Sequence, residues 1–538
     1  MMKKIFLTLA LISPQIFAIN ATSGGKLSKN QSAMDVVHYD LRLKVDPSKN
    51  IIGGSVIISF VLLEKTDDLE IDLLKKFNVF GTIVNGMSVA FKHEKNKILI
   101  ENPELELFKT HSLEIKYSGK PPSAKNPPWD GGLTWKRSKD GQPWISVSCQ
   151  KNGAYIWYPC KEHPSDKADS ADITITVPQP LVVASNGLLQ STYQTKDRWQ
   201  TWHWKTKYPI SSYNINFTAG NFIAVEKTGY ILNNPLYMVY YVLPESQDGA
   251  DALLKEAEGY LNFYANHFGQ YPWMDEKFGL VETPYWGMEH QTINAYGNKY
   301  KKTKLGYDFL MFHEMGHEWW GNYLSVADWA DFWIHEGFDT YAEALFIEEK
   351  YGLSASRNFV EQRYKKNITN EWPVVPSRNS TTENKAGSDI YYKGAHILHT
   401  LRYLIGKDIL EESLKEFLYM PKEWSKNQTS TEEFMSLIQM NSGKDLNWFF
   451  KQYLFKGQLP TLNIKTKNVK DKKFIDYWWE ENGFFMPLEI SFKSFDGIRE
   501  RTLELNNSPK RIAIPASSEV SLDPNGWLLF QTKETSNF

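Results

Sequence analysis

Two histidines and a later glutamate occur at a spacing that suits a metal ion. Residues 312–319 read FHEMGHEW, which places His313 and His317 four residues apart. On a helix, residues four apart lie on one face, so both imidazoles can point at a single ion. Two neutral imidazoles and one carboxylate suit zinc. Glu336, in the later segment WIHEGF, is the candidate third ligand, because eighteen residues separate it from His317 and allow a turn and a second antiparallel helix.

Three protein ligands leave one coordination position open, which is the catalytic rather than the structural arrangement. Glu314 follows His313 but is rotated away from the ligand direction. We therefore expect Glu314 to act as a general base that takes a proton from water and returns it to a leaving amine. Glu343, seven residues after Glu336, falls on the same expected helix face and is predicted to hold a ligand histidine in place. The sequence thus predicts one catalytic zinc ion per chain.

The elements that must position these residues change type along the chain. In the first part of the chain, short runs of alternating or β-branched residues are separated by Gly, Pro and Asn-Gly turns, which indicates a β-sandwich or saddle-shaped sheet. The predicted strands are 38–45, 55–60, 112–117, 144–147, 173–177 and 214–217. Apolar residues at helical spacing then predict helices at 252–268, 307–320, 336–351, 395–405 and 431–438. The strand pattern returns at 462–464, 488–492 and 500–505.

This order predicts a multidomain α+β protein. A length of 538 residues agrees with about three or four domains. We expect an N-terminal β-domain at 26–223, a mostly α-helical zinc catalytic domain at 224–457 and a small C-terminal β-sandwich at 458–538.

Composition and the N-terminus limit the partners. The 61 basic and 63 acidic residues leave a formal charge of -2, without the basic footprint of a nucleic-acid binder. Lys3 and Lys4 precede an apolar run at 5–12, then Pro14 and Ala18, so residues 1–18 read as a signal peptide. We therefore expect a periplasmic or secreted protein. No run reaches the roughly 20 apolar residues that span a bilayer, so membrane insertion is not expected.

The two cysteines support two interpretations. An oxidising compartment permits a bridge between Cys149 and Cys160. Both are equally well explained as buried small apolar groups.

Three motifs together resemble one known family. The zinc motif, YWGMEH at 285–290 and YYKGA at 391–395 are similar to those of the zinc aminopeptidases of peptidase family M1, which include a leukotriene hydrolase branch. The resemblance covers most of the chain, from VVHYDLRL at 36–43 through SCQ at 148–150 and WYPC at 157–160 to the last β-segments. It implies a thermolysin-like catalytic domain and, as substrates, peptides with a free N-terminus.

The resemblance also implies roles for residues outside the zinc motif. Glu289 would anchor the α-amino group of the peptide, and Gln150 would be a second contact to that group. A buried ammonium group needs an opposite charge. A carboxylate that binds it near zinc would therefore place the first peptide bond of the substrate at the metal. Gly287 and Met288 would pair with the extended substrate backbone. Tyr391 would stabilise the oxyanion through its hydroxyl.

Trp286, His290 and His335 depart from the family pattern. Trp286 and His290 replace the first and last residues of the family's Gly-Ala-Met-Glu-Asn, and His335 stands where Asn is common before the third ligand. Trp286 could line the first side-chain pocket, and His290 could change how Glu289 is held. We do not expect His335 to bind the metal.

Other functions remain open on this pattern. They are a zinc epoxide hydrolase of the leukotriene-hydrolase type, a non-catalytic peptide-binding protein and a zinc endopeptidase. Glu289 and Gln150 favour an exopeptidase, and nothing indicates a lipid tunnel. Many larger members carry a helical domain that caps the cleft, whereas few residues follow the β-segments of 461–530. We therefore expect three domains and a more open cleft than in those larger members. Separately, we expect a monomer.

Overall fold

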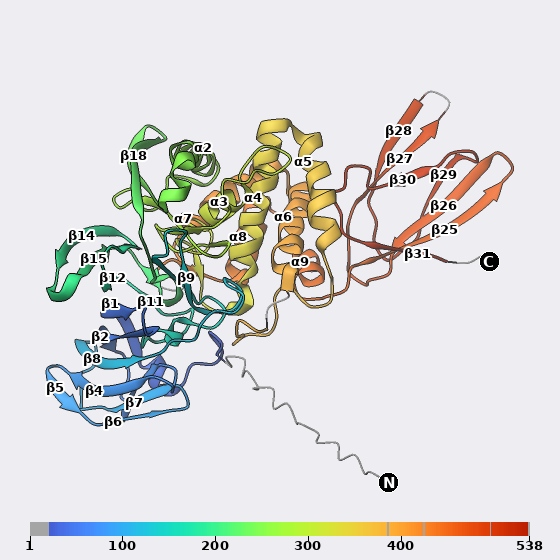
Figure 1. The fold of residues 1–538 in the computed structure, drawn as a ribbon. Coiled ribbons are helices and arrows are strands. Elements are labelled where there is room, and N and C mark those ends of the chain that lie inside the picture. The colour runs from blue at the N-terminus through green and yellow to red at the C-terminus, as the bar shows by residue number, and fades with distance from the viewer. Residues whose placement is uncertain (1–20, 385–386, 423–425, 495–496, 536–538) are drawn as a thin grey trace, which may run out of the picture.

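A computed structural model describes residues 21–384, 387–422, 426–494 and 497–535 of the chain. The expected signal peptide at 1–18 lies outside the described residues. Along the chain, the described part passes from a β-rich unit through a helical unit to a second β-rich unit, as Figure 1 shows. This order agrees with the fold class predicted from the sequence, whereas the domain boundaries at 223/224 and 457/458 stay predictions.

The N-terminal unit is built on an eight-stranded sheet with the order β14-β15-β12-β1-β2-β8-β4-β5. In β1 (Met34–Asp46) buried and more exposed residues alternate over most of the strand, so one face of the sheet packs on the core. The other strands of this sheet are β2 (Ile51–Leu62), β4 (Asn78–Val84), β5 (Met87–Val89), β8 (Thr110–Gly119), β12 (Ser170–Pro178), β14 (Leu188–Gln194) and β15 (Trp199–Thr206).

Three smaller sheets belong to this unit. Their orders are β13-β17-β10-β9, β3-β7-β6 and the pair β11 (Lys167–Ala168) with β16 (Ile210–Ser211). The strands of the first two are β13 (Val182–Ser185), β17 (Phe217–Gly220), β10 (Pro143–Ser148), β9 (Gly132–Arg137), β3 (Asp68–Asp72), β7 (Lys97–Glu101) and β6 (Phe91–Glu94). The strand predicted at 214–217 is wrong, because a 3-10 turn, η3 (Ser212–Asn214), precedes β17 and the strand begins only at Phe217.

The middle unit contains a five-stranded sheet that the sequence pattern did not predict. Its order is β18-β19-β20-β22-β21, which places β21 at an edge. The strands are β18 (Ile223–Ile231), β19 (Asn234–Val242), β20 (Phe278–Glu282), β21 (Gly287–Met288) and β22 (Asn294–Tyr296). The last three have two to five residues, too few for a period of two to stand out.

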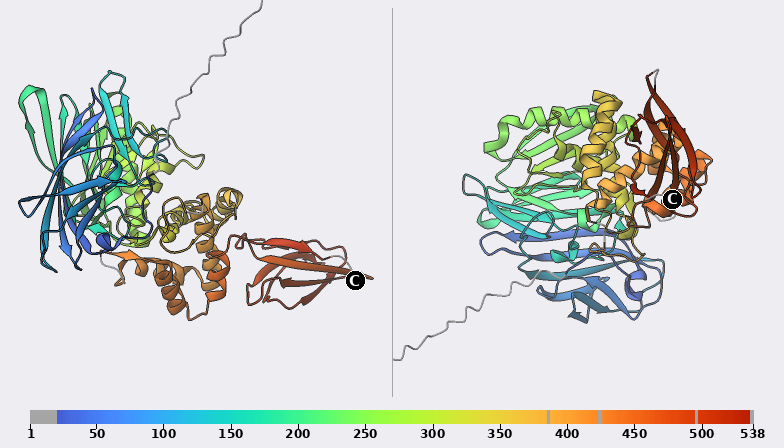
Figure 2. Two further views of the ribbon diagram at one scale, coloured as in Figure 1. Left: turned by 90° about the horizontal axis from the view of Figure 1, so that it is seen from below. Right: turned by 90° about the vertical axis from the view of Figure 1, so that its right-hand side faces the viewer.

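Helices cover this sheet and form most of the rest of the middle unit (Figures 1 and 2), which also contains the strand pair β23 (Ser325–Val326) and β24 (Gln428–Thr429). The helices are α2 (Ala250–Phe268), α3 (Phe309–Gly316), α4 (Trp333–Tyr351), α5 (Leu353–Phe359), α6 (Tyr392–Ile405), α7 (Lys407–Tyr419), α8 (Thr431–Ser442) and α9 (Asn447–Tyr453). Helix α3 begins after Asp308, whose side chain accepts from Met311 N and caps the helix. It ends four residues earlier than the predicted 307–320, because Trp319 N bonds Gly316 O in a tighter turn.

The C-terminal unit packs two sheets, β29-β26-β25-β31 and β28-β27-β30, and extends away from the helices (Figures 1 and 2). Tyr453 at the end of α9 donates to Leu529 O at 2.8 Å and connects the two units. The strands are β25 (Thr461–Val469), β26 (Lys472–Trp479), β27 (Leu488–Ser494), β28 (Gly497–Leu503), β29 (Lys510–Pro515), β30 (Val520–Leu522) and β31 (Gln531–Glu534).

The described residues bear on the cysteines and on membrane-spanning helices. Cys149 and Cys160 are both buried free thiols, which agrees with the second interpretation. Throughout the described part of the chain, no helix has the length and apolar character that crossing a membrane requires.

Candidate functional site

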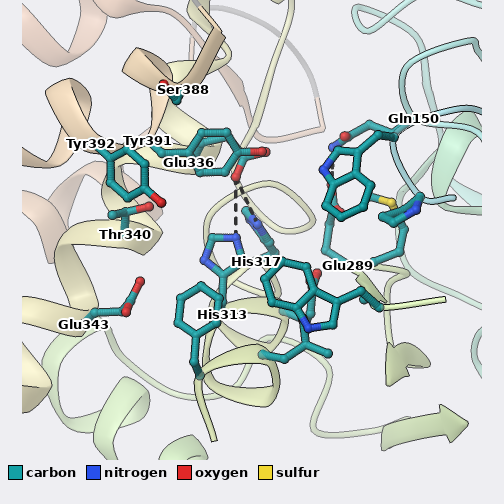
Figure 3. A pocket seen from close by; sticks show the side chains of 18 of the residues that line it. Gln150, Glu289, His313, His317, Glu336, Thr340, Glu343, Ser388, Tyr391 and Tyr392 are labelled. Carbon is teal, nitrogen blue, oxygen red and sulfur yellow. Dashed lines mark hydrogen bonds and ion pairs between the residues drawn. The ribbon is translucent and has the colours of Figure 1, made fainter. Parts of the chain in front are cut away.

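The three predicted metal-binding side chains converge on one point, as Figure 3 shows. Glu336 Oε2 lies 3.7 Å from His313 Nε2 and 3.4 Å from His317 Nε2. Zinc bonds of about 2.0–2.1 Å at tetrahedral angles require donor atoms about 3.3–3.4 Å apart. His313, His317 and Glu336 therefore fit a zinc ion with little movement.

Neighbouring acceptors orient both imidazoles. His313 Nδ1 forms an ion pair with Asp339, 2.6 Å from its Oδ2, and His317 Nδ1 donates to the carbonyl oxygen of Trp320 at 2.9 Å. A donor role for Nδ1 leaves Nε2 of each ring unprotonated and able to bind a metal. Burial lowers the pKa of His313, but the charge of Asp339, the contact of Asp339 with the ring and the charge of Glu314 together outweigh burial and raise this pKa to about 9.

Asp339 occupies a space that a glycine leaves open. Tyr264 Oη donates to Asp339 Oδ1 at 2.8 Å, which fixes the carboxylate from its other side. A Cβ atom on Gly316 would lie 1.6 Å from Asp339 Oδ1. Gly316, at the end of α3, therefore allows α4 to bring this carboxylate against His313.

The structure gives the Glu343 carboxylate a hydrogen-bond partner other than the ligand histidine that the sequence predicted. This carboxylate accepts from Tyr307 Oη at 3.1 Å, and within the described residues it makes no hydrogen bond to His313 or His317. The carboxylate that holds the ligand histidine belongs to Asp339, one helical turn earlier. Asp339 stands three residues after Glu336, and this i, i+3 spacing is the signal that could have identified it.

Glu314 lies beside the metal-binding group rather than in it. Carboxylate oxygens of Glu314 and Glu289 and a ring nitrogen of His317 all lie within 4.8 Å of one another. Burial raises the pKa of Glu314 to about 8, although the neighbouring His313 opposes this rise, and burial also raises the pKa of Glu289. Together with Glu336, the site therefore holds three carboxyl groups close together. A divalent metal ion and a positively charged substrate group would balance their negative charge.

Glu289 is held by side chains from both the β-rich and the helical unit. Gln150 Nε2, from the loop after β10, donates to Glu289 Oε1. Tyr213 Oη, from η3, donates to the same oxygen at 3.3 Å, and Asn322 Nδ2 donates to the Glu289 carbonyl oxygen at 2.9 Å. The sequence missed Tyr213 because it lies next to the wrongly predicted strand at 214–217. The structure thus brings Gln150 and Glu289 together, 139 residues apart in sequence.

Gly287 and Met288 form β21 and pair only with β22 in the described sheet, so the other edge of β21 faces the site. A Cβ atom on Gly287 would lie 2.4 Å from Glu314 Oε1. Glycine therefore lets the backbone of β21 approach the carboxylate of α3. An extended peptide could add to this edge as a further strand.

Tyr391 reaches the metal-binding group through close packing of two helices. A Cβ atom on Gly337 of α4 would lie 3.0 Å from Gly394 Cα of α6, so the two backbones nearly touch. Tyr391, just before α6, donates from its hydroxyl to Glu336 Oε1 at 3.0 Å. Burial raises the pKa of Tyr391 well above its ordinary value, so the hydroxyl remains a proton donor.

A cavity of about 490 Å³ lies over these groups, and Figure 3 shows many of its side chains. All ten predicted site residues line it. The lining residues that the sequence did not single out are Pro128, Trp129, Lys151, Phe309, Leu310, Thr340, Arg363, Gly387, Ser388 and Tyr392.

The three departures from the family pattern lie in different surroundings. Trp286 lines the cavity. His290 is buried, and neither ring nitrogen has a hydrogen-bond partner among the described residues, so His290 does not hold Glu289 through its ring. His335 Nε2 accepts from Val326 N at 3.1 Å, which turns this nitrogen away from the metal-binding group.

Comparisons with known proteins agree with this fold and site. The Peptidase family M1 domain matches residues 254–453, and the Peptidase M1 N-terminal domain matches residues 36–214. Human glutamyl aminopeptidase is 21% identical over 490 residues, covering 82% of this chain and 48% of its own length. Leucine aminopeptidase 2 of Candida albicans is 24% identical over 367 residues, covering 66% of this chain and 56% of its own length. The chain thus spans about half the length of these curated relatives.

Solved structures share the fold. An M1 zinc metallopeptidase from Deinococcus radiodurans superposes with a TM-score of 0.68 at 22% identity, over 81% of this chain and 96% of that chain. Legionella pneumophila aminopeptidase A, in complex with aspartic acid, superposes with a TM-score of 0.78 at 17% identity, over 96% of this chain and 61% of that chain.

Proposed function

The chain belongs to peptidase family M1, and from this premise and the geometry of the site we propose that it is a zinc-dependent aminopeptidase. It would hydrolyse the first peptide bond of peptides that have a free N-terminus. One zinc ion per chain would be held by His313, His317 and Glu336.

The observation that carries this proposal is the buried carboxylate of Glu289 beside the metal-binding group. Glu289 is 3% exposed, and within the described residues no lysine or arginine forms an ion pair with it. A buried carboxylate is costly unless a positive group compensates it. The α-ammonium of a peptide is such a group, and Gln150 and Tyr213 orient the carboxylate to receive it. An amino terminus bound at Glu289 leaves space for one residue before the metal.

The chain's own residues supply the remaining steps. Zinc, when bound, supplies a Lewis acid that polarises the scissile carbonyl and makes a water molecule more acidic. Glu314 accepts the proton of the attacking water at its carboxylate and returns it to the nitrogen of the leaving amine. The Tyr391 hydroxyl donates to the oxygen that becomes negative, a contribution of about 3–4 kcal/mol in comparable sites. The edge of β21 keeps the peptide extended while this happens.

The test uses aminoacyl-coumarin substrates, one N-acetylated control and a zinc chelator. We expect cleavage of free-amine substrates only, and only with metal. In a Glu289→Gln variant the amide cannot compensate the ammonium, so we expect KM to rise at least tenfold. Equal cleavage of the acetylated control would contradict the proposal and indicate an endopeptidase. Zinc binding without any peptide cleavage would indicate a peptide-binding protein or, with an epoxide substrate turned over, an epoxide hydrolase.

We also propose that the protein is exported as a monomer to the periplasm or the exterior. The support is the basic and apolar N-terminal segment described above. N-terminal sequencing of the exported protein should begin close to residue 19, and light scattering should give one chain per particle. A mature protein that still begins at Met1 in the cytoplasm would contradict export.

A further inference from the structure

Three aromatic side chains form a continuous row along one side of the cavity. Trp129 and Trp286 have ring centroids 6.1 Å apart, and Trp286 and Phe309 have centroids 5.9 Å apart. We call Trp129, Trp286 and Phe309 the aromatic row. Trp129 comes from the N-terminal unit, Trp286 from the loop before β21 and Phe309 from the first turn of α3. All three line the same cavity as the metal-binding group.

The aromatic row is exposed at one end and fixed at the other. Trp129 is 55% exposed and Trp286 is 42% exposed, so two neighbouring indoles present apolar surface to the cavity mouth. Phe309 stacks on His313 with centroids 5.6 Å apart, and the Arg363 guanidinium lies 5.0 Å from the Phe309 centroid. A metal ligand and a cation thus hold the inner ring in place. Adjacent exposed aromatic rings at a cavity are typical of a surface that binds an apolar group.

The direction of β21 relative to α3 decides which part of a peptide would contact the row. Glu289 lies near His317, Gly287 lies against Glu314, and one residue earlier Trp286 lies against Phe309. A peptide bound by its amino group at Glu289 would therefore place its scissile bond near Glu314. Its following residues would continue toward the aromatic row.

The length of the strand sets the register. Trp286 lies three positions before Glu289, which is about 10 Å in extended backbone at roughly 3.3 Å per residue. A peptide added antiparallel to β21 would thus bring its second or third residue over Trp286. This is the leaving side of the scissile bond, rather than the first side-chain pocket that the sequence suggested for Trp286.

We propose that the aromatic row selects peptides with an aromatic or bulky aliphatic side chain at the second or third residue. The proposal rests on the aminopeptidase function proposed above, because it takes the amino terminus to lie at Glu289. Covering two indoles with such a side chain removes apolar surface from water on both partners. Alanine or glycine at these positions would leave the indoles exposed.

The test compares tetrapeptides that share the first residue, with release of leucine measured by mass spectrometry. For the wild-type protein we expect kcat/KM for Leu-Phe-Gly-Gly or Leu-Gly-Phe-Gly to exceed that for the corresponding alanine peptide at least tenfold. Trp129→Ala and Trp286→Leu should each reduce this ratio at least threefold. Trp372→Ala removes an indole that is 66% exposed and does not line the cavity, so its ratio should equal that of the wild type.

The outcomes separate this proposal from the proposed function. Cleavage of all peptides without a preference at the second or third residue would overturn the role of the aromatic row and leave the aminopeptidase intact. The same ratio in Trp129→Ala, Trp286→Leu and the wild type would also overturn it. If no peptide is cleaved, calorimetric titration of the zinc-loaded protein with the same peptides still tests whether the aromatic row prefers an aromatic side chain. A Phe-to-Ala affinity ratio below threefold would then overturn the proposal.

Discussion

Asp339 provides the sharpest test of how the metal-binding group is assembled. Its Oδ2 lies 2.6 Å from His313 Nδ1, with which it forms an ion pair, and Asp339 is fully buried. In an Asp339→Asn variant, the amide nitrogen can face Nδ1 and donate to it. The proton of His313 would then move to Nε2, the nitrogen that must bind the metal. We expect this substitution to weaken zinc binding.

The magnitude follows from the type of bond that is lost. A hydrogen bond to a charged group contributes about 1.5–3 kcal/mol. Since about 1.4 kcal/mol corresponds to a factor of ten, zinc affinity should fall by roughly 10- to 150-fold. This agrees with the loss of about 10- to 100-fold that is usual when the partner of a ligand histidine is removed.

The assay is competition for zinc against a chelating dye at fixed pH and ionic strength, using apoprotein whose melting temperature has been checked. Glu343→Gln is the matched control, because Glu343 lies one turn later on α4 and accepts from Tyr307 instead. Its zinc affinity should change less than threefold. The reasoning is refuted if Asp339→Asn binds zinc like the wild type, or if Glu343→Gln loses as much affinity.

Three further predictions follow from the same geometry. In Gly316→Ala the new Cβ would lie 1.6 Å from Asp339 Oδ1, so the carboxylate must move. Zinc affinity should therefore fall at least as far as in Asp339→Asn. A thermal melt should also show a loss of about 1–3 kcal/mol in the free energy of unfolding, because the site is overpacked. A variant with unchanged affinity and melting temperature would contradict this. Tyr391→Phe should lower kcat about 10²- to 10³-fold with KM changed little, since the hydroxyl acts on the oxygen that becomes charged; an effect confined to KM would count against that role. Cys149 and Cys160, both buried, should resist an aromatic disulfide reagent in the native protein and titrate as two thiols after denaturation, whereas no thiols after denaturation would indicate a bridge.

The positions of strands and helices were predictable where their pattern was long. The helix predicted at 252–268 lies within α2, and the strand predicted at 173–177 lies within β12. The prediction missed the nine-residue strands β18 and β19 and the helix α7, and it also failed at the shortest strands. Strands β20, β21 and β22 have two to five residues and exist because they pair with each other and with β19, a contact that no local pattern records.

The same division applies to the side chains around the metal. The sequence by itself determined that His313 and His317 share one helix face, because their spacing matches the helical period. It also placed Glu336 at the right distance along the chain, since eighteen residues suffice for the second helix to return. Local spacing could not decide which carboxylate on α4 would meet His313. Asp339 does so only because Gly316 leaves room for it.

The opposite end of the site depended on tertiary structure almost entirely. Motif resemblance pointed to Glu289 and Gln150, but Tyr213 joins them from a turn 76 residues away in sequence. The aromatic row likewise combines residues from two units of the fold. Local sequence determines which side chains of a single helix or strand point in the same direction, because the helical or strand period fixes the direction of each side chain. The packing of separate elements decides which groups meet across the cavity, because those contacts depend on how surfaces distant in the sequence fit together.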